Sequence, residues 1–111
     1  MGFGYGGIGR RTHVHRYNNI TSLDVGHKHG MNGITGPTIR TGTSHVHSLN
    51  GVTTFDQGHS HNYRTVTGPA IPTRPGYHVH RYSGRVTIAG RTPHTHTFNA
   101  LTAEAPDDIG Y

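Results

Sequence analysis

The sequence predicts an all-β fold, built as a repeat protein of short strands and hairpins. Three observations predict it. The motif His-x-His occurs six times, and a spacing of two places both side chains on the same face of a β-strand. Dipeptides typical of tight turns recur, each flanked by apolar residues. Helix formers such as Ala, Leu, Glu and Lys are scarce, which argues against helices.

The paired histidines are the main chemical signal. All 12 histidines fall into the six pairs, so the spacing is not a by-product of a His-rich composition. On a strand, two such imidazoles lie roughly 6.6 Å apart along the chain and can lean together onto one metal ion. On a helix they would point about 200° apart. The pattern therefore predicts transition-metal binding. The candidate ligands are His13, His15, His27, His29, His45, His47, His59, His61, His78, His80, His94 and His96.

Each pair opens a longer unit. A bulky apolar residue follows, then two turn-like residues, an apolar residue and Thr, as in HVHSLNGVT at 45–53. Tight turns are predicted at Asn18-Asn19, Asn32-Gly33, Asn50-Gly51 and Ser83-Gly84. Spacings between pairs alternate short and long, so two units make one larger repeat. The sequence thus predicts three repeats of about 32 residues within a domain at 13–102, namely 13–44, 45–77 and 78–102.

These turns fix a register. A turn at 18–19 pairs His13 with Asp24, and a turn at 50–51 pairs His45 with Asp56. A carboxylate that accepts the free imidazole N–H commonly supports a metal-bound histidine, so Asp24 and Asp56 are predicted in that role. The alternative is that both residues simply begin Asp-x-Gly turns.

Two flanking segments differ from the repeats. Residues 1–12 form a Gly-rich arm, and residues 103–111 form an acidic tail. Opposite charges and apolar residues without a local core suit contacts between subunits; the alternative is two solvated ends. The predicted assembly contacts are Phe3, Tyr5, Ile8, Arg10, Arg11, Asp107, Asp108 and Tyr111.

The composition limits the other function classes. Apolar residues make up 30% of the chain, and Gly and Pro together 23 of 111 residues, so metal, stacked repeats or neighbouring subunits could supply the missing stability. The alternative is disorder, which the strict periodicity argues against. The absence of Cys excludes disulfides and thiolate metal sites. The net charge of +5 is spread along the chain without a recognition motif, so nucleic acid is not expected as a partner.

The sequence leaves the cellular location open. It shows no apolar run of membrane-span length and no signal peptide, so neither is expected. An extracellular or particle-associated filament would need another export route; otherwise the protein is expected in the cytoplasm.

The order of motifs resembles a known family. The alternating His-x-His, Asp-x-Gly-His-x-His and Thr-Gly-Pro segments, clearest at 45–72, are similar to the small bacterial YmaF family. That resemblance spans roughly 13–102 and implies a short, repeat-rich, metal-binding protein. The His-x-His chemistry is also similar to the tip of phage long tail fibres. There, such motifs from three strands surround octahedral iron ions.

The leading hypothesis is a structural, self-assembling metal-binding protein, an oligomer or filament of itself. Three pairs supply six nitrogens, suited to octahedral iron, cobalt or nickel; two pairs supply four, suited to zinc, and copper is a further candidate. The first His-x-His pairs of the three repeats can converge within one chain, and so can the second pairs. Alternatively, neighbouring subunits can share an ion. The alternative function is soluble metal storage or delivery. An enzyme is not expected, because the only Glu, Glu104, lies far from the motifs in the sequence.

Overall fold

The computed structural model describes residues 13–107. These residues form strands and no helix, as the sequence predicts, so none of them provides a helix that could cross a membrane. The strands are β1 (Arg16–Ile20), β2 (Gly30–Ile34), β3 (Ile39–Thr41), β4 (Ser44–Val46), β5 (Ser48–Val52), β6 (Asn62–Val66), β7 (Ala70–Pro72), β8 (Tyr77–Arg85), β9 (Thr97–Leu101) and β10 (Ala105–Pro106).

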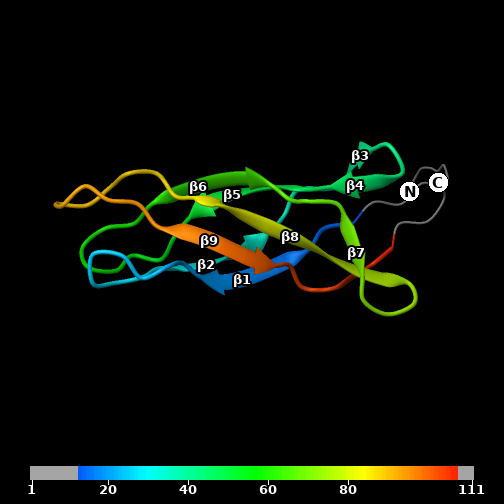
Figure 1. Ribbon diagram of the computed structural model, residues 1–111, viewed down its shortest axis with the longest axis horizontal. Helices are drawn as coiled ribbons and strands as arrows, with labels where there is room; N and C mark the ends of the chain where they lie inside the picture. Colours follow the sequence, from blue (N-terminus) through cyan, green and yellow to red (C-terminus); the bar gives the residue numbers. More distant parts are fainter. Residues whose placement is uncertain (1–12, 108–111) are drawn as a thin grey trace.

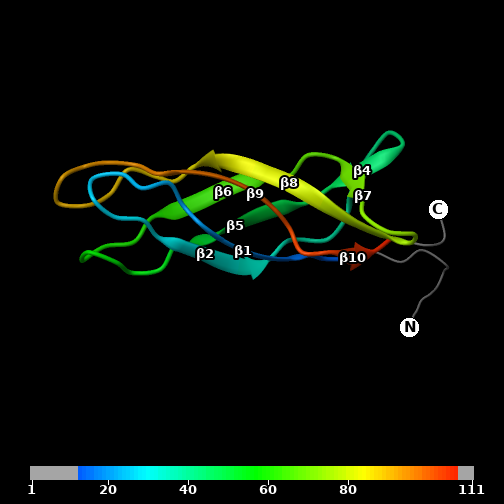
Figure 2. The ribbon, with the colours of Figure 1, turned by 60° about the horizontal axis from the view of Figure 1, so that its bottom comes forward.

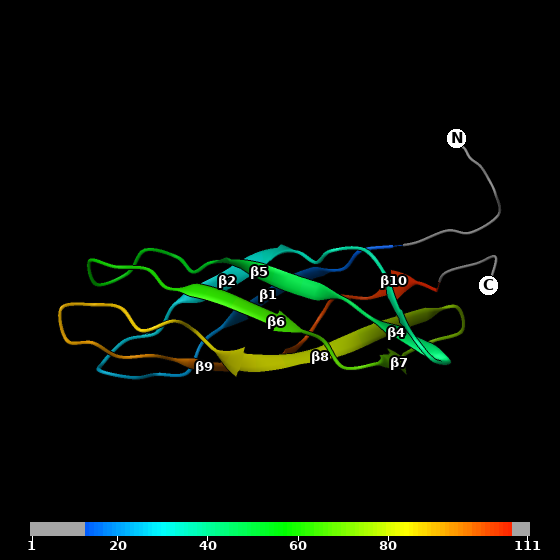
Figure 3. The same cartoon turned by 90° about the horizontal axis from the view of Figure 1, so that it is seen from above.

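Three long antiparallel hairpins, β1–β2, β5–β6 and β8–β9, form the body of the molecule. They run along the long axis of an elongated body of 51 × 26 × 20 Å (Figure 1). Their turns lie together at one end, on the left of Figures 1 and 3. The short strands β3, β4, β7 and β10 gather at the opposite end (Figures 1 and 2). There β3 pairs with β4, and β7 and β10 both pair with β8.

The hairpins join one another in a closed ring. The backbone N–H of Gly36 donates to Ser48 O of the second hairpin, and Gly68 N–H donates to Arg81 O of the third, both at 2.8 Å. The third returns to the first, where Ala103 N–H donates to Arg16 O at 2.8 Å. The same cyclic order holds nearer the turns, through Thr54–Gly30, Thr87–Asn62 and Ser22–Thr97. Each hairpin therefore has a hairpin on either side.

The predicted tight turns are wrong. Asn18 lies in mid-strand opposite Asn32, and Asn50 opposite Arg64. The chain reverses further on, where isolated bridges join Asp24 to His27 and Asp56 to His59. Both residues enclosed by the first of these turns have positive φ, 51° at Val25 and 78° at Gly26. This is the backbone of a type I′ hairpin turn, although a β-branched residue fills one position.

The glycines of the Asn-Gly and Ser-Gly pairs serve packing instead. A Cβ added to Gly33 would lie 2.7 Å from Tyr17 Oη, and one added to Gly51 would lie 2.6 Å from Tyr63 Oη. At Gly84 it would lie 2.9 Å from the Phe98 ring. Each ring lies across the backbone of the facing strand, so glycine is needed for the close approach rather than for a left-handed φ.

The apolar core occupies the middle of the body. It contains the residue two positions after each His-x-His, and every one of these is buried: Tyr17, Met31, Leu49, Tyr63, Tyr82 and Phe98. The aromatic rings meet at angles, with Tyr17 and Tyr82 centroids 5.6 Å apart. A core this small leaves much of the stability to the layers on either side of it.

Candidate metal centres

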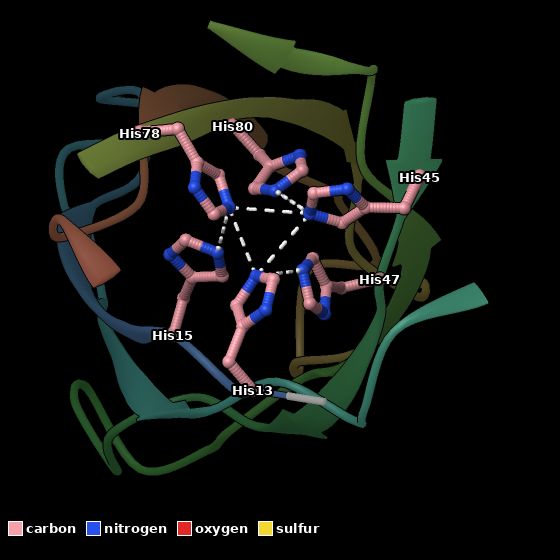
Figure 4. Close-up of side chains that lie close together, drawn as sticks. All are labelled: His13, His15, His45, His47, His78 and His80. Atoms are coloured by element: carbon pink, nitrogen blue, oxygen red, sulfur yellow. Dashed lines mark hydrogen bonds between the residues drawn. The ribbon is translucent and has the colours of Figure 1, made fainter. Parts of the chain in front are cut away.

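The described residues contain two clusters of six histidines. We call His13, His15, His45, His47, His78 and His80 the base centre, and His27, His29, His59, His61, His94 and His96 the tip centre. In each centre the candidate ligand atoms all lie within 4.8 Å of one another. Figure 4 shows the base centre, where the rings point to a common middle. Of the two arrangements open from the sequence, the structure has convergence within one chain.

The second histidine of each pair, the inner one, lies next to the apolar core, and the first is the outer one. Each inner imidazole places Nδ1 beside a backbone carbonyl of the neighbouring hairpin. The contacts, 2.7–3.0 Å long, are His15–Ala103, His29–Thr54, His47–Gly36, His61–Thr87, His80–Gly68 and His96–Ser22. A carbonyl only accepts, so Nδ1 carries the proton and the Nε2 lone pair faces the centre.

Buried threonines hold the inner histidines in place. The Thr35 hydroxyl accepts from His15 N–H at 3.0 Å and donates to Gly36 O at 3.0 Å. Gly36 O in turn faces Nδ1 of His47 in the next hairpin. Equivalent hydroxyl contacts are made by Thr21, Thr53, Thr67 and Thr102. Each hydroxyl thus links the backbone of one inner histidine to the carbonyl that faces the inner histidine of a neighbouring hairpin. At the sixth position, Val86 takes the place of threonine.

The outer histidines are held differently in the two centres. In the base centre, His78 Nδ1 lies 2.7 Å from Asp107 Oδ1, and His13 Nδ1 lies 3.4 Å from Thr38 Oγ1. In the tip centre, each outer Nδ1 faces a carbonyl of its own turn, two residues back: Val25 for His27, Gln57 for His59 and Thr92 for His94.

The predicted partners of Asp24 and Asp56 are wrong, because the register is different. Asp24 lies 3.5 Å from Nδ1 of His96 and Asp56 lies 3.5 Å from Nδ1 of His29, so both belong to the tip centre. The backbone of each Asp also pairs with the histidine three residues on, Asp24 with His27 and Asp56 with His59. This agrees with the alternative that both residues begin a turn. In the third hairpin Ala89 occupies the corresponding bridge.

Burial favours the neutral form of four inner histidines, His15, His61, His80 and His96. Burial is the largest cause that lowers the pKa of His15 to about 4 and that of His80 to about 3. The pKa values of His61 and His96 are lowered for the same reason. Neutral imidazole is the form that binds metal.

The Nε2 atoms are arranged so that one cation could be shared between them. His15 and His78 both use Nδ1–H for other partners, yet their Nε2 atoms are 3.1 Å apart, so lone pair faces lone pair. In the tip centre, Nε2 of His29, His61 and His96 is buried without any hydrogen-bond partner. A buried, unpartnered nitrogen is costly. One metal ion at each centre would satisfy these atoms together.

The spacing fits an octahedral ion. In the base centre, neighbouring Nε2 atoms are 2.9–3.2 Å apart. In a regular octahedron the distance from the centre to each vertex is the edge length divided by the square root of two. The nitrogens are therefore about 2.1–2.3 Å from the middle, near the usual metal–imidazole bond of about 2.0–2.1 Å. The outer triangle of the tip centre has the same size, 3.1–3.2 Å.

Sequence reasoning missed three supports of the centres. It treated threonine as the end of a strand, although Thr recurs eight residues after the first histidine in five of the six units. It did not identify the carbonyls that face Nδ1, because backbone atoms leave no sequence signal. It assigned Asp107 to assembly alone, whereas its carboxylate contacts His78 of the same chain.

The other predicted assembly contacts lie outside the described residues. They are Phe3, Tyr5, Ile8, Arg10, Arg11, Asp108 and Tyr111. Their role stays a prediction.

Comparison with known proteins agrees with the resemblance seen in the sequence. The family model YmaF, described as spore germination protein GerY/YamF, matches residues 10–103. No curated protein and no solved structure matches the chain. The match covers most of the chain and both histidine clusters, so the protein belongs to the YmaF family.

Proposed function

We propose that the protein is a structural, non-enzymatic metal-binding protein whose base and tip centres each hold one octahedral transition-metal ion. The observation that carries this proposal is the set of six convergent Nε2 atoms in each centre, three of them buried without partners in the tip centre. Six imidazoles leave no open coordination position, which argues against metal catalysis. The donor set favours iron(II), cobalt(II) or nickel(II) over zinc, because zinc prefers four ligands.

Metal analysis tests the proposal directly. Protein purified, stripped and reloaded with nickel or cobalt should contain two ions per chain, one for each cluster. The double variant His47→Ala with His61→Ala removes one inner ligand from each centre and is expected to lose both ions. A reloaded wild-type chain with no bound ion, or with ions held by four histidines only, would contradict the proposal.

The proposal extends to an internal threefold repeat and to self-assembly. Corresponding residues of the three hairpins occupy corresponding places, as Tyr17, Leu49 and Tyr82 do in the core. Large apolar side chains are exposed along the outside of the body, for example Ile20 at 61% and Val52 at 60%. Such surfaces are commonly covered by another molecule, and a second copy in a filament would cover them here.

The second candidate is soluble metal storage or delivery. It is supported by the fact that all six ligands of each centre come from one chain, so binding needs no second subunit. Sedimentation of the metal-loaded protein separates the two candidates. A filament or oligomer supports the structural role, and deletion of residues 2–9 should then reduce its size with both ions retained. A monomer at micromolar concentration favours storage.

The family description names spore germination. We propose that process as the setting in which this metal-stabilised fold acts. Deletion of the gene in a spore-forming host, followed by measurement of germination with and without added metal, would test this assignment; normal germination under both conditions would contradict it.

A further inference from the structure

The two centres have different surroundings. The base centre is enclosed: five of its six histidines are buried, the sixth being His13. His45 lies in β4, which pairs with β3, and His78 lies in β8 between β7 and β10. Asp107, just after β10, contacts His78. His45 and His78 of the base centre are therefore held in strands that further strands flank, β3 beside β4, and β7 and β10 beside β8.

The tip centre ends in three separate turns, 24–27, 56–59 and 89–94. Its outer histidines, His27, His59 and His94, are only partly buried. Within the described range, each outer imidazole is oriented by a carbonyl of its own turn and contacts other hairpins only through the facing imidazoles. The turns reach a neighbouring hairpin otherwise only through two carboxylate contacts of 3.5 Å, Asp24–His96 and Asp56–His29.

The backbone hydrogen bonds between hairpins stop below the turns. The last backbone hydrogen bonds between hairpins are Ser22–Thr97, Thr54–Gly30 and Thr87–Asn62, at the level of the inner histidines. Among the described residues, no hydrogen bond beyond the imidazole contacts joins 23–28, 55–60 and 88–95 to one another. The outer Nε2 atoms lie 3.1–3.2 Å apart, and their lone pairs repel one another at this distance. A cation between them would attract all three lone pairs and hold the turns together.

Charge does not distinguish the two ends. Asp24 and Asp56, whose side chains are 44% and 45% exposed, flank the tip centre, and each accepts from a hydroxyl of its own hairpin. Lys28 and Arg91 lie in or beside the same turns. At the base, the 55% exposed side chain of Asp107 contacts His78. The inference therefore depends on how the outer ligands are held.

We propose that the tip centre is the exchangeable one: its ion enters and leaves through the face formed by His27, His59 and His94 and closes the three turns onto one another, while the base centre retains its ion. This inference rests on the proposed function. Release needs only the three turns to separate, and the ring of inter-hairpin hydrogen bonds stays intact. In the base, two of the three outer ligands, His45 and His78, lie in β4 and β8, so their separation would require these strands to move; the third, His13, precedes β1 and contacts Thr38.

Chelator-induced release of nickel tests this inference. Full-length protein loaded with two nickel ions per chain is mixed with excess EDTA, and free and bound metal are followed with time. Two phases of equal amplitude are expected, the faster by about 10–100-fold. His59→Ala should abolish the fast phase and keep one slowly released ion. The matched base variant His45→Ala should abolish the slow phase.

Hydrogen exchange provides a measurement that needs no variant. Nickel should slow amide exchange in the turns 24–27 and 56–59 at a concentration where the base centre is already filled. A single release rate for both ions, a fast phase retained in His59→Ala, or turns equally protected without nickel would each overturn the exchange proposal and leave the proposed function standing. A chain that binds neither nickel nor cobalt overturns both.

Discussion

The base and tip centres use the same motif and hold their inner ligands on carbonyls in the same way, yet the other groups around them differ. Three threonine hydroxyls support the inner ligands of the base, whereas the tip has two because Val86 fills the third place. A carboxylate contacts an outer ligand in the base, and carboxylates approach inner ligands in the tip. Identical ligands thus provide one enclosed and one terminal centre. The comparison predicts that the surroundings of a ligand set, as well as the set itself, would determine how firmly an ion is held.

Acid acts on several histidines at once and should have the largest effect. The pKa of His15 is lowered to about 4 and that of His80 to about 3 in the folded base centre, against 6.5 in the unfolded chain. Between these values the unfolded chain binds more protons, so stability is complete above pH 6.5 and falls as the pH decreases. The metal-free protein should melt at steadily lower temperature from pH 7 to pH 4. A flat profile would show that the inner histidines are not held neutral.

Removal of one inner ligand should distinguish the centres. In the metal-loaded protein, His47→Ala in the base should lower the free energy of unfolding by about 3–5 kcal/mol, and His61→Ala in the tip by about 2–3 kcal/mol. Each leaves a buried cavity, but the base also anchors β4, β7 and β10. Urea unfolding at neutral pH gives both values. Equal losses would mean that the surrounding short strands add nothing to the base.

Asp107→Asn tests the carboxylate at the base. The amide oxygen can still accept from His78 Nδ1–H but carries no negative charge. The imidazole is then less basic, and its Nε2 is a weaker metal ligand. Metal affinity of the base centre should fall about 10–100-fold, with the tip unchanged. Competition with a chelator of known affinity measures this. Glu104→Gln is the matched control, because Glu104 pairs with Arg74 rather than with a histidine.

The threonines should give the smallest effects. Thr53→Val removes the hydroxyl that accepts from His61 N–H at 2.9 Å, and should cost about 1–3 kcal/mol. Val86→Thr places a hydroxyl opposite His96 and should raise stability by about 0.5–1.5 kcal/mol. Thermal unfolding of the two variants should shift in opposite directions. A loss of stability in Val86→Thr would show that this position is shaped for an apolar side chain.

The strand content and the pairing of histidines on one strand face were predictable, because a spacing of two residues can be read directly from the sequence. Convergence within one chain was one of two arrangements that the sequence left open. The turns were not predictable. Asn50-Gly51 has the composition of a hairpin turn, but its glycine lies under the ring of Tyr63 from the paired strand. Local composition cannot separate a glycine that turns from one that makes room, since the second depends on a residue elsewhere in the chain. The wrong turns then gave the wrong partners for Asp24 and Asp56.

The closed ring of hairpins also bears on how the chain is made. His15 relies on Ala103 and His96 relies on Ser22, so each centre combines groups from the start and the end of the described chain. A chain still emerging from the ribosome lacks His94 and His96 until its last hairpin is synthesised, and its first hairpins meanwhile have no partner to close against. Contacts this distant in sequence slow folding. If the chain binds metal as proposed, its early histidine pairs would be open to the wrong ion during synthesis, and the order in which metal and chain become available would decide which ion the base centre encloses.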